Sequence, residues 1–478
     1  METRKIEGSN RVSAGSLHEM YGSASIGVSM GYNRETGKEV FQFNEDRFRH
    51  TLILGRTGSG KSNHIQLMER QDIRNGAGVA IIASHEEDAI YPLTWVPEWR
   101  MNDTVIIDAS NKRYLPCLNP LDVNIYDENA VSKAIGNVIE LLSTDCHYEW
   151  TGPRFKHMVR IGLELILDPG YPYARSIGEL EKLFRDADYA REALMRCTNE
   201  TTKGQWQQHA SVYRSSDSGD MMEWFLSKVS PFTTDEVLKN MFGPGRVTID
   251  FDDIVNNGKI LVVAIPEARI SKEASRLIAS WVTARLKDAI LNRGVLLEAE
   301  DVTSGDLGIF AQRTEKATQL LDPFFVYIDE FAKVATPEFG ALLAESRKFR
   351  VGFVLSMQTL SQAKVQDMHS MRESTLLQAI LGNVGTVVCY PMGAPDAQTM
   401  ADFFDVDPHK TKRIERYMPL AMMCLDNDLV GPLELKINEK PKSAWPSTPR
   451  RIARRHIGRR IWRPTIAELK RRKCQKSA

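Results

Sequence analysis

A chain of 478 residues has room for about three domains, or for one large domain with insertions. Its apolar content of 42% and charged content of 26% are ordinary for a soluble globular chain, and its longest apolar runs are strand-sized, so we expect no integral membrane segment in it. The formal net charge is zero, but residues 442–478 contain 13 Lys or Arg and one acidic residue, so the rest of the chain is acidic. An acidic body does not exclude a nucleic-acid motor, because such a motor can have basic loops in its pore.

The cysteine pattern and the N-terminus both favour the cytoplasm. The first residues lack the apolar core of a signal peptide. Six cysteines are scattered without a C-x-x-C pair, and Cys146-His147 has no second pair at metal-ligand spacing. We therefore expect a reduced, cytoplasmic protein without a metal at Cys146-His147.

Residues 1–45 predict a loose arm followed by a short β element. Residues 1–20 are polar and unpatterned. By contrast, 25–32 and 39–43 alternate enough to indicate two or three short strands around a glycine-rich turn.

The strongest pattern is Gly55-Arg56-Thr57-Gly58-Ser59-Gly60-Lys61-Ser62, directly behind the apolar run Thr51-Leu52-Ile53-Leu54. The glycines let backbone N–H groups curl around phosphate oxygens, where side chains would block them. Lys61 can reach the β and γ phosphates, and Ser62 offers a hydroxyl to Mg²⁺ at the start of a helix whose dipole favours anions. We therefore predict an ATP- and Mg²⁺-binding loop before a helix over 61–75, rather than a bare glycine turn, with nucleotide contacts from Gly55, Thr57, Gly58, Ser59, Gly60, Lys61 and Ser62.

Further apolar runs of strand length lie at 78–83, 104–108 and 259–266. Continuous apolar strands separated by helices predict a parallel sheet covered on both faces, so the core is α/β. We assign this core to 46–121 and 243–440.

Residues 122–242 follow a different pattern. Apolar residues such as Ala134, Val138 and Leu141 recur at helical spacing, and apolar strand runs are missing. This predicts an all-α domain inserted into the core. After the sheet resumes, 277–290 predict a long amphipathic helix, and 294–320 a polar, irregular surface excursion.

An apolar strand over 324–328 ends in Asp329 and Glu330. A pair of acids at the end of a buried strand is typical of the second half of an ATP-hydrolysing site. We expect Asp329 to hold Mg²⁺, and Glu330 to act as the general base for the attacking water.

Three more residues are candidates for the same site. The helix that follows Thr336-Pro337 ends near 346–350, and the strand 351–356 leads to Gln358, which can sense the γ-phosphate or orient water. A buried, satisfied glutamine is the alternative. Arg347 is the candidate cation for phosphoryl charge in a neighbouring subunit's site, with Arg350 in reserve and a solvated arginine as the alternative.

The tail, 441–478, begins with a proline-rich linker and continues with arginine pairs interleaved with Ile457, Ile461 and Trp462. It predicts either a basic helix for DNA phosphates or an acidic partner, or a solvated, partly disordered tail.

Eight stretches of the chain carry a family resemblance: 49–55, 118–122, 152–154, 327–331, 345–349, 358, 382–386 and 396–397. In this order they resemble the HerA/FtsK superfamily of DNA motors, and specifically the TraG/TraD-like coupling ATPases of conjugative type IV secretion. One departure is Ala83-Ser84-His85-Glu86-Glu87, where related motors often carry Asp-Pro-His, so that aspartate's role is lost or moved to Glu86 or Glu87.

The resemblance implies a RecA-like P-loop core, a homo-hexamer with ATP between subunits, and a central channel for DNA. It implies that the all-α domain contacts DNA or a relaxase, and that secretion-channel proteins can recruit the chain to the inner membrane. It also implies the roles given above for Lys61, Ser62, Asp329, Glu330, Gln358 and Arg347.

We therefore expect an ATP-driven DNA translocase of the coupling-protein type. Two alternatives stay open at this point. One is a HerA-like motor that works with a nuclease in DNA processing or defence. The other is an ATP-switched scaffold that recruits a partner without translocation.

Overall fold

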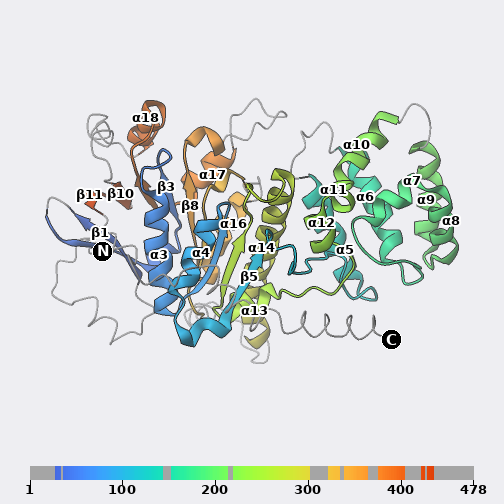
Figure 1. The fold of residues 1–478 in the computed structure, drawn as a ribbon, viewed down its shortest axis with the longest axis horizontal. Coiled ribbons are helices and arrows are strands. Elements are labelled where there is room, and N and C mark those ends of the chain that lie inside the picture. The colour runs from blue at the N-terminus through green and yellow to red at the C-terminus, as the bar shows by residue number, and fades with distance from the viewer. Residues whose placement is uncertain are drawn as a thin grey trace.

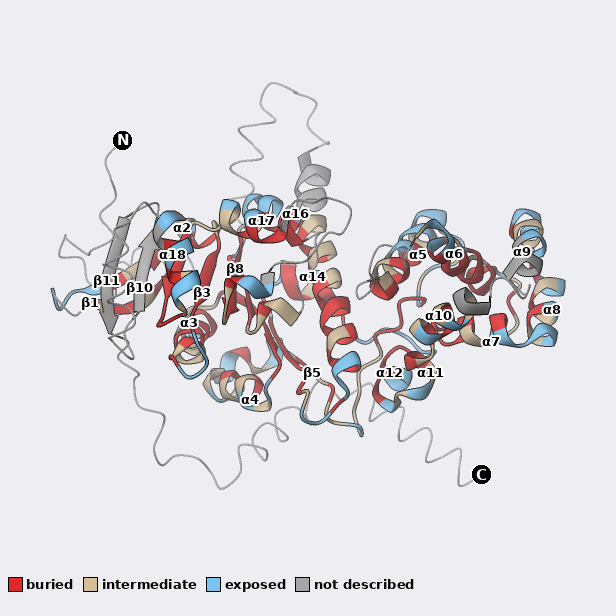
Figure 2. Cartoon of the chain, turned by 90° about the horizontal axis from the view of Figure 1, so that it is seen from above, coloured by how far each residue is buried: buried red, intermediate tan, exposed pale blue. Residues whose placement is uncertain are grey.

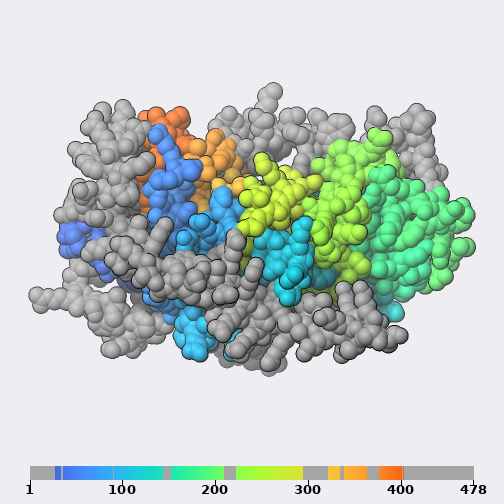
Figure 3. Space-filling model, viewed as in Figure 1, coloured from blue at the N-terminus to red at the C-terminus, as the bar shows by residue number. Residues whose placement is uncertain are grey.

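The chain folds into a large sheet flanked by helices and a group of helices at one end (Figure 1). In Figure 3 the green residues of this helical group occupy one end of the molecule, and the blue N-terminal strands and α3 lie toward the other. The structure is a computed structural model, and it describes residues 27–33, 36–143, 152–213, 219–301, 321–333, 339–363, 375–403, 421–425 and 428–434.

The sheet has the strand order β2-β1-β11-β10-β9-β3-β8-β7-β4-β6-β5. All pairs from β9 to β5 are parallel, whereas the pairs among β9, β10, β11, β1 and β2 are antiparallel. The mainly parallel sheet and the small N-terminal β element are thus confirmed. The strands are β1 Gly27–Asn33, β2 Glu39–Phe43, β3 Thr51–Leu54, β4 Gly78–Ala83, β5 Thr104–Asp108, β6 Ile260–Ala264, β7 Phe324–Ile328, β8 Val351–Met357, β9 Thr386–Cys389, β10 Ala421–Leu425 and β11 Asp428–Glu434.

The central strands are buried on both faces, which explains their continuous apolar runs. Every residue of β3, β4, β7 and β8 is buried. In β7, Phe325 and Tyr327 join a core with α3 (Lys61–Asn75) and α4 (Glu86–Trp95). Phe324 and Val326 join the core on the other face, with α14 (Lys272–Asp301), α16 (Phe339–Ser346) and α17 (Thr375–Asn383).

The prediction of irregular structure from residue 294 onward is wrong for its first part. Helix α14 runs through Gly294 to Asp301. The stretch 295–300, Val-Leu-Leu-Glu-Ala-Glu, consists mostly of good helix formers, and one glycine costs only about 1 kcal/mol in a helix. The local propensity therefore continues the helix past the glycine.

Between residues 122 and 242 the described part of the chain contains helices and no strand. Their buried residues form one continuous core with the α14 face of the sheet, and Figure 2 shows buried stretches in α5, α6 and α14. Whether these residues form a separate domain stays a prediction. The helices are α5 Glu128–Ser143, α6 Pro153–Leu167, α7 Glu179–Arg185, α8 Ala187–Arg196, α9 Glu200–Tyr213, α10 Gly219–Val229, α11 Pro231–Thr234 and α12 Glu236–Met241; the remaining helices near the sheet are α2 Asn44–Arg47, α13 Phe251–Asn256 and α18 Ala394–Phe403.

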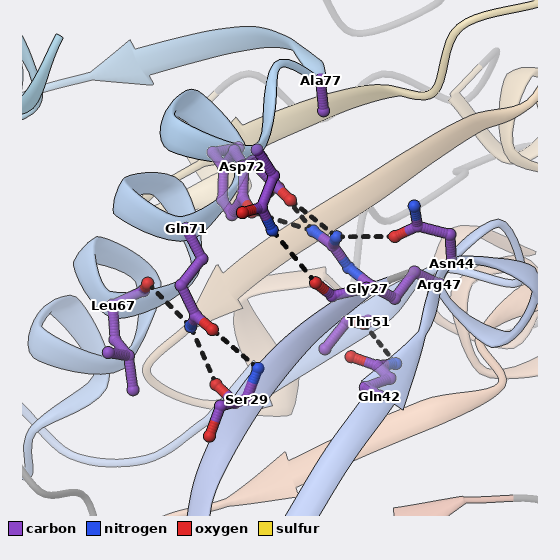
Figure 4. A network of polar contacts seen from close by, with 12 residues as sticks. Gly27, Ser29, Gln42, Asn44, Arg47, Thr51, Leu67, Gln71, Asp72 and Ala77 are labelled. Atoms are coloured by element: carbon purple, nitrogen blue, oxygen red, sulfur yellow. Dashed lines mark hydrogen bonds and ion pairs between the residues drawn. The ribbon is translucent and has the colours of Figure 1, made fainter. Parts of the chain in front are cut away.

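A buried polar network ties the end of α3 to the N-terminal β element and to β7 (Figure 4). The Arg47 guanidinium donates to both carboxylate oxygens of Asp72, at 2.8 and 2.6 Å, and to Asn44 Oδ1 at 3.1 Å. Tyr327 Oη on β7 also donates to Asp72. The network therefore links the helix that follows the glycine-rich loop to the strand that Asp329 directly follows.

Five predictions fall outside the described residues. They concern the N-terminal arm, the absence of a metal at Cys146-His147, the irregular stretch over 302–320, the start of a helix at Thr336-Pro337 and the nature of the basic tail. Within the described ranges, no helix combines the length and apolar character needed to cross a bilayer.

Candidate nucleotide-binding site

The glycine-rich loop joins β3 to α3, as predicted, and packs against Tyr390, which directly follows β9. Gly55, Gly58 and Gly60 all have positive φ, at 154°, 76° and 109°. A Cβ on Gly55 would lie 2.4 Å from the Tyr390 Cβ, and one on Gly60 would lie 3.2 Å from its ring. Tyr390 Oη and His64 Nδ1 are 3.0 Å apart, so the tyrosine also connects the loop to α3.

Gly55→Ala should therefore destabilise the protein by about 1–3 kcal/mol more than Gly58→Ala. A Cβ on Gly58 has no neighbour within 4 Å, so that variant meets only the strain of positive φ, about 1–2 kcal/mol. The two free energies of unfolding can be compared by urea denaturation. An equal loss in both variants would contradict the close contact with Tyr390.

The interior of the loop fits an anionic group. The Lys61 ammonium is buried and donates to the carbonyl oxygens of Gly55 at 2.5 Å and Arg56 at 3.0 Å. Burial lowers the pKa of Lys61, and the charges of Asp329 and Glu330 oppose this shift. The Ser59 hydroxyl is buried without a hydrogen-bond partner among the described residues. The loop thus contributes a buried cation and a hydroxyl without a described partner, and it contains no acidic residue.

Asp329 lies directly across from the start of α3. Ser62 Oγ donates to Asp329 Oδ2 at 3.2 Å, and Ser356 Oγ on β8 donates to Oδ1 at 2.6 Å. The Glu330 N–H donates to Oδ1 at 3.0 Å. The hydroxyl and carboxylate predicted to hold Mg²⁺ are thus neighbours, and oxygen ligands of this kind suit that ion.

Glu330 follows in the left-handed region, with φ of 53°, which is unusual for a residue other than glycine. Gln358 Nε2 donates to its Oε1 at 3.3 Å, and His85 Nε2 lies 3.6 Å from the same oxygen. Lys333 Nζ lies 2.5 Å from Oε2 and 3.0 Å from Glu267. Burial acts to raise the pKa of Glu330, but the hydrogen bond and charge of Lys333, helped by His85, hold it below its ordinary value.

The strand order explains why these residues meet. Strand β8 lies between β3 and β7, and the carboxyl ends of parallel strands share one edge of the sheet. The end of β8 therefore places Gln358 between the loop and Glu330. Of the predicted residues, the structure brings together Lys61, Ser62, Asp329, Glu330 and Gln358, with Thr57, Gly58, Ser59 and Gly60 in the adjoining loop.

Arg347 and Arg350 are not part of this group. They precede β8, so its seven residues, about 20 Å of strand, separate them from the edge that carries the loop. Arg347 is exposed, whereas the Arg350 guanidinium lies over the Phe48 ring at 5.4 Å. Neither arginine can reach its own chain's loop from there.

Several residues near the acids were missed from the sequence. Glu86 pairs with Arg269, at 2.7 Å, and Glu87 is exposed; a role for either in place of the aspartate of related motors stays a prediction. His85 and Lys333 contact Glu330 instead, and Ser356 contacts Asp329. His85 directly follows a strand end, which was the available signal. No sequence signal pointed to Lys333 or Ser356.

Comparison with protein-family models finds no match. Among curated proteins, the type 4 coupling protein DotL of Legionella pneumophila is 22% identical over 379 residues, covering 69% of this chain and 46% of DotL. The chain therefore spans less than half the length of this relative.

Solved structures show the fold. The conjugative coupling protein TrwB, in an unbound form, has 16% identity and a TM-score of 0.54, covering 89% of this chain and 92% of TrwB. TrwB with the ATP analogue ADPNP has 16% identity and a TM-score of 0.54, covering 90% and 97%. VirB4 of Thermoanaerobacter pseudethanolicus has 13% identity and a TM-score of 0.55, covering 86% and 96%. The α/β fold class and the resemblance to coupling proteins are thus confirmed.

Proposed function

We propose that this chain, which shares the fold of conjugative coupling proteins, is an ATPase that moves DNA in type IV secretion. The observation that carries the proposal is the meeting of Ser62, Asp329, Glu330 and Gln358 beside the Lys61 loop. ATP and Mg²⁺ are the ligands that this arrangement suits. TrwB, a structural neighbour, has been solved with ADP and Mg²⁺ and with an ATP analogue.

Each residue has a distinct role in the proposed reaction. Lys61 and Ser59 bind phosphate oxygens, together with the backbone N–H groups of the loop. Ser62 and Asp329 would hold Mg²⁺, which when bound neutralises charge on the β and γ phosphates. Gln358 orients the attacking water, and Glu330 accepts its proton. Lys333 pairs with Glu330 Oε2 and lowers the pKa of Glu330, so Glu330 becomes a stronger base when this contact loosens.

We propose that Arg347 acts on the site of a neighbouring subunit in a hexameric ring. Its exposed side chain at the opposite end of β8 supports this role, because it cannot reach its own loop. We also propose that residues 122–242 form a domain that contacts DNA or a relaxase, and that the tail, 441–478, binds phosphates or an acidic partner.

The steady-state ATPase rate, measured without DNA, with single-stranded DNA and with duplex DNA, tests the proposal. We expect stimulation of about tenfold or more by DNA, a change of about 1.4 kcal/mol in the activation free energy. Lys61→Ala and Glu330→Gln are the blanks and should abolish it. Stronger stimulation by single-stranded DNA would favour DNA transfer, whereas stronger stimulation by duplex DNA would favour a nuclease-partnered motor. If the protein forms ATP-dependent oligomers but DNA does not change its ATPase rate, the translocase proposal is contradicted and the ATP-switched scaffold is supported.

A further inference from the structure

A small cavity lies beside Ser62 and Asp329, between α3, α4 and the sheet. Its polar wall is formed by Ser62, Gln66, Glu69, Asp88 and Asp329, and its volume is about 10 Å³. This is close to the room that one ordered water molecule needs, and such a water requires two to four polar partners, roughly what this wall offers.

Glu69 is the unusual member of this wall. Its side chain is 3% exposed, and its Oε2 atom is buried without a hydrogen-bond partner in the part of the chain that the structure describes. An unpaired buried carboxylate is strongly unfavourable. Burial, and then the charges of Asp88 and Asp329, raise the pKa of Glu69 well above its ordinary value. Glu69 is thus an unpaired acid in the cavity wall, at a place where its charged form is disfavoured.

The missing partner is positive or donates hydrogen bonds. Glu69, Asp88 and Asp329 all line the cavity, and none of the described residues around it is Lys or Arg. Gln66 Nε2 donates to Asp88 Oδ1 at 3.1 Å. No group of three acidic, His or Cys side chains in the described ranges is placed to hold a metal ion directly. A cation held by Ser62 and Asp329 would therefore act on Glu69 and Asp88 through water.

We propose that Glu69 and Asp88 form an outer shell for the Mg²⁺ site of Ser62 and Asp329, and accept hydrogen bonds from a metal-bound water in the cavity. Mg²⁺ keeps several of its waters in proteins, and outer-shell carboxylates orient such ligands. This inference rests on the proposed nucleotide site. It gives the buried carboxylate of Glu69 a partner only when the ion is present.

The test measures ADP binding by calorimetry, in EDTA and across a MgCl₂ series, for wild type, Glu69→Gln and Asp88→Asn. We expect ADP affinity in EDTA to stay within about twofold, and the Mg²⁺ concentration for half-maximal effect to rise about tenfold in both variants. A residue that only supports the fold would change both values together. Glu98→Gln, an exposed acid just beyond the end of α4, is the matched control and should leave both unchanged.

The outcomes separate the inference from the function on which it rests. If Mg²⁺ changes ADP binding in wild type and equally in both variants, the outer shell is overturned and the nucleotide site stands. If wild type binds ADP but Mg²⁺ has no effect on it, the outer shell is also overturned. If wild type binds no ADP, with or without Mg²⁺, both fail. If Glu69→Gln does not fold, Asp88→Asn decides, because Asp88 is only half-buried.

Discussion

Replacing Glu330 by Gln should lower the rate of ATP hydrolysis by about 10²- to 10⁴-fold while ATP binding stays within a fewfold. The amide keeps the size of the carboxylate and can still contact Gln358 and Lys333, but it cannot accept a proton from water. Steady-state hydrolysis and the affinity for a non-hydrolysable ATP analogue would be measured side by side.

Glu345→Gln is the matched control for this variant. Glu345 is exposed on α16, near the end of β8 that lies away from the loop, so its change should leave hydrolysis unaltered. Hydrolysis by Glu330→Gln within about threefold of wild type would remove Glu330 from the role of general base. Loss of analogue binding would instead indicate a damaged site.

Asp72→Asn should lower the free energy of unfolding by about 3–5 kcal/mol, because it leaves the Arg47 charge buried without its partner. Arg47 and Asp72 are 1% and 3% exposed at the side chain, so water cannot replace the lost contact. The variant also weakens the contact with Tyr327, which holds α3 against β7. Urea denaturation monitored by fluorescence gives the midpoint and the slope.

A triple variant, Arg47→Met with Asp72→Leu and Tyr327→Phe, separates charge from packing. Replacing a buried ion pair by apolar residues of similar volume is often neutral, so the triple variant should regain most of the lost stability. A loss of less than about 1 kcal/mol in Asp72→Asn would show that the network does not depend on the ion pair.

The residues within the glycine-rich loop were predictable because their signal is local. Glycine spacing, Lys61 and Ser62 lie in one short stretch behind an apolar run, and the backbone conformation follows from those residues alone. The helix over 61–75 and the apolar strands were identified for the same reason. The end of α14 was not, because the polar, irregular composition of 294–320 as a whole hides the helix formers at its start.

What the sequence determined by itself is the chemistry available to this protein: the phosphate loop, the two acids after a buried strand, and an α/β core. Only the tertiary structure decided which of these residues meet. Strand β8 separates β3 from β7, Arg347 lies away from its own loop, and Glu69 lacks a partner in a cavity beside Asp329. Such contacts join residues far apart in the chain, as in the pair Arg47 and Tyr327, 280 positions apart. Their geometry depends on strand order, which local residue patterns do not specify.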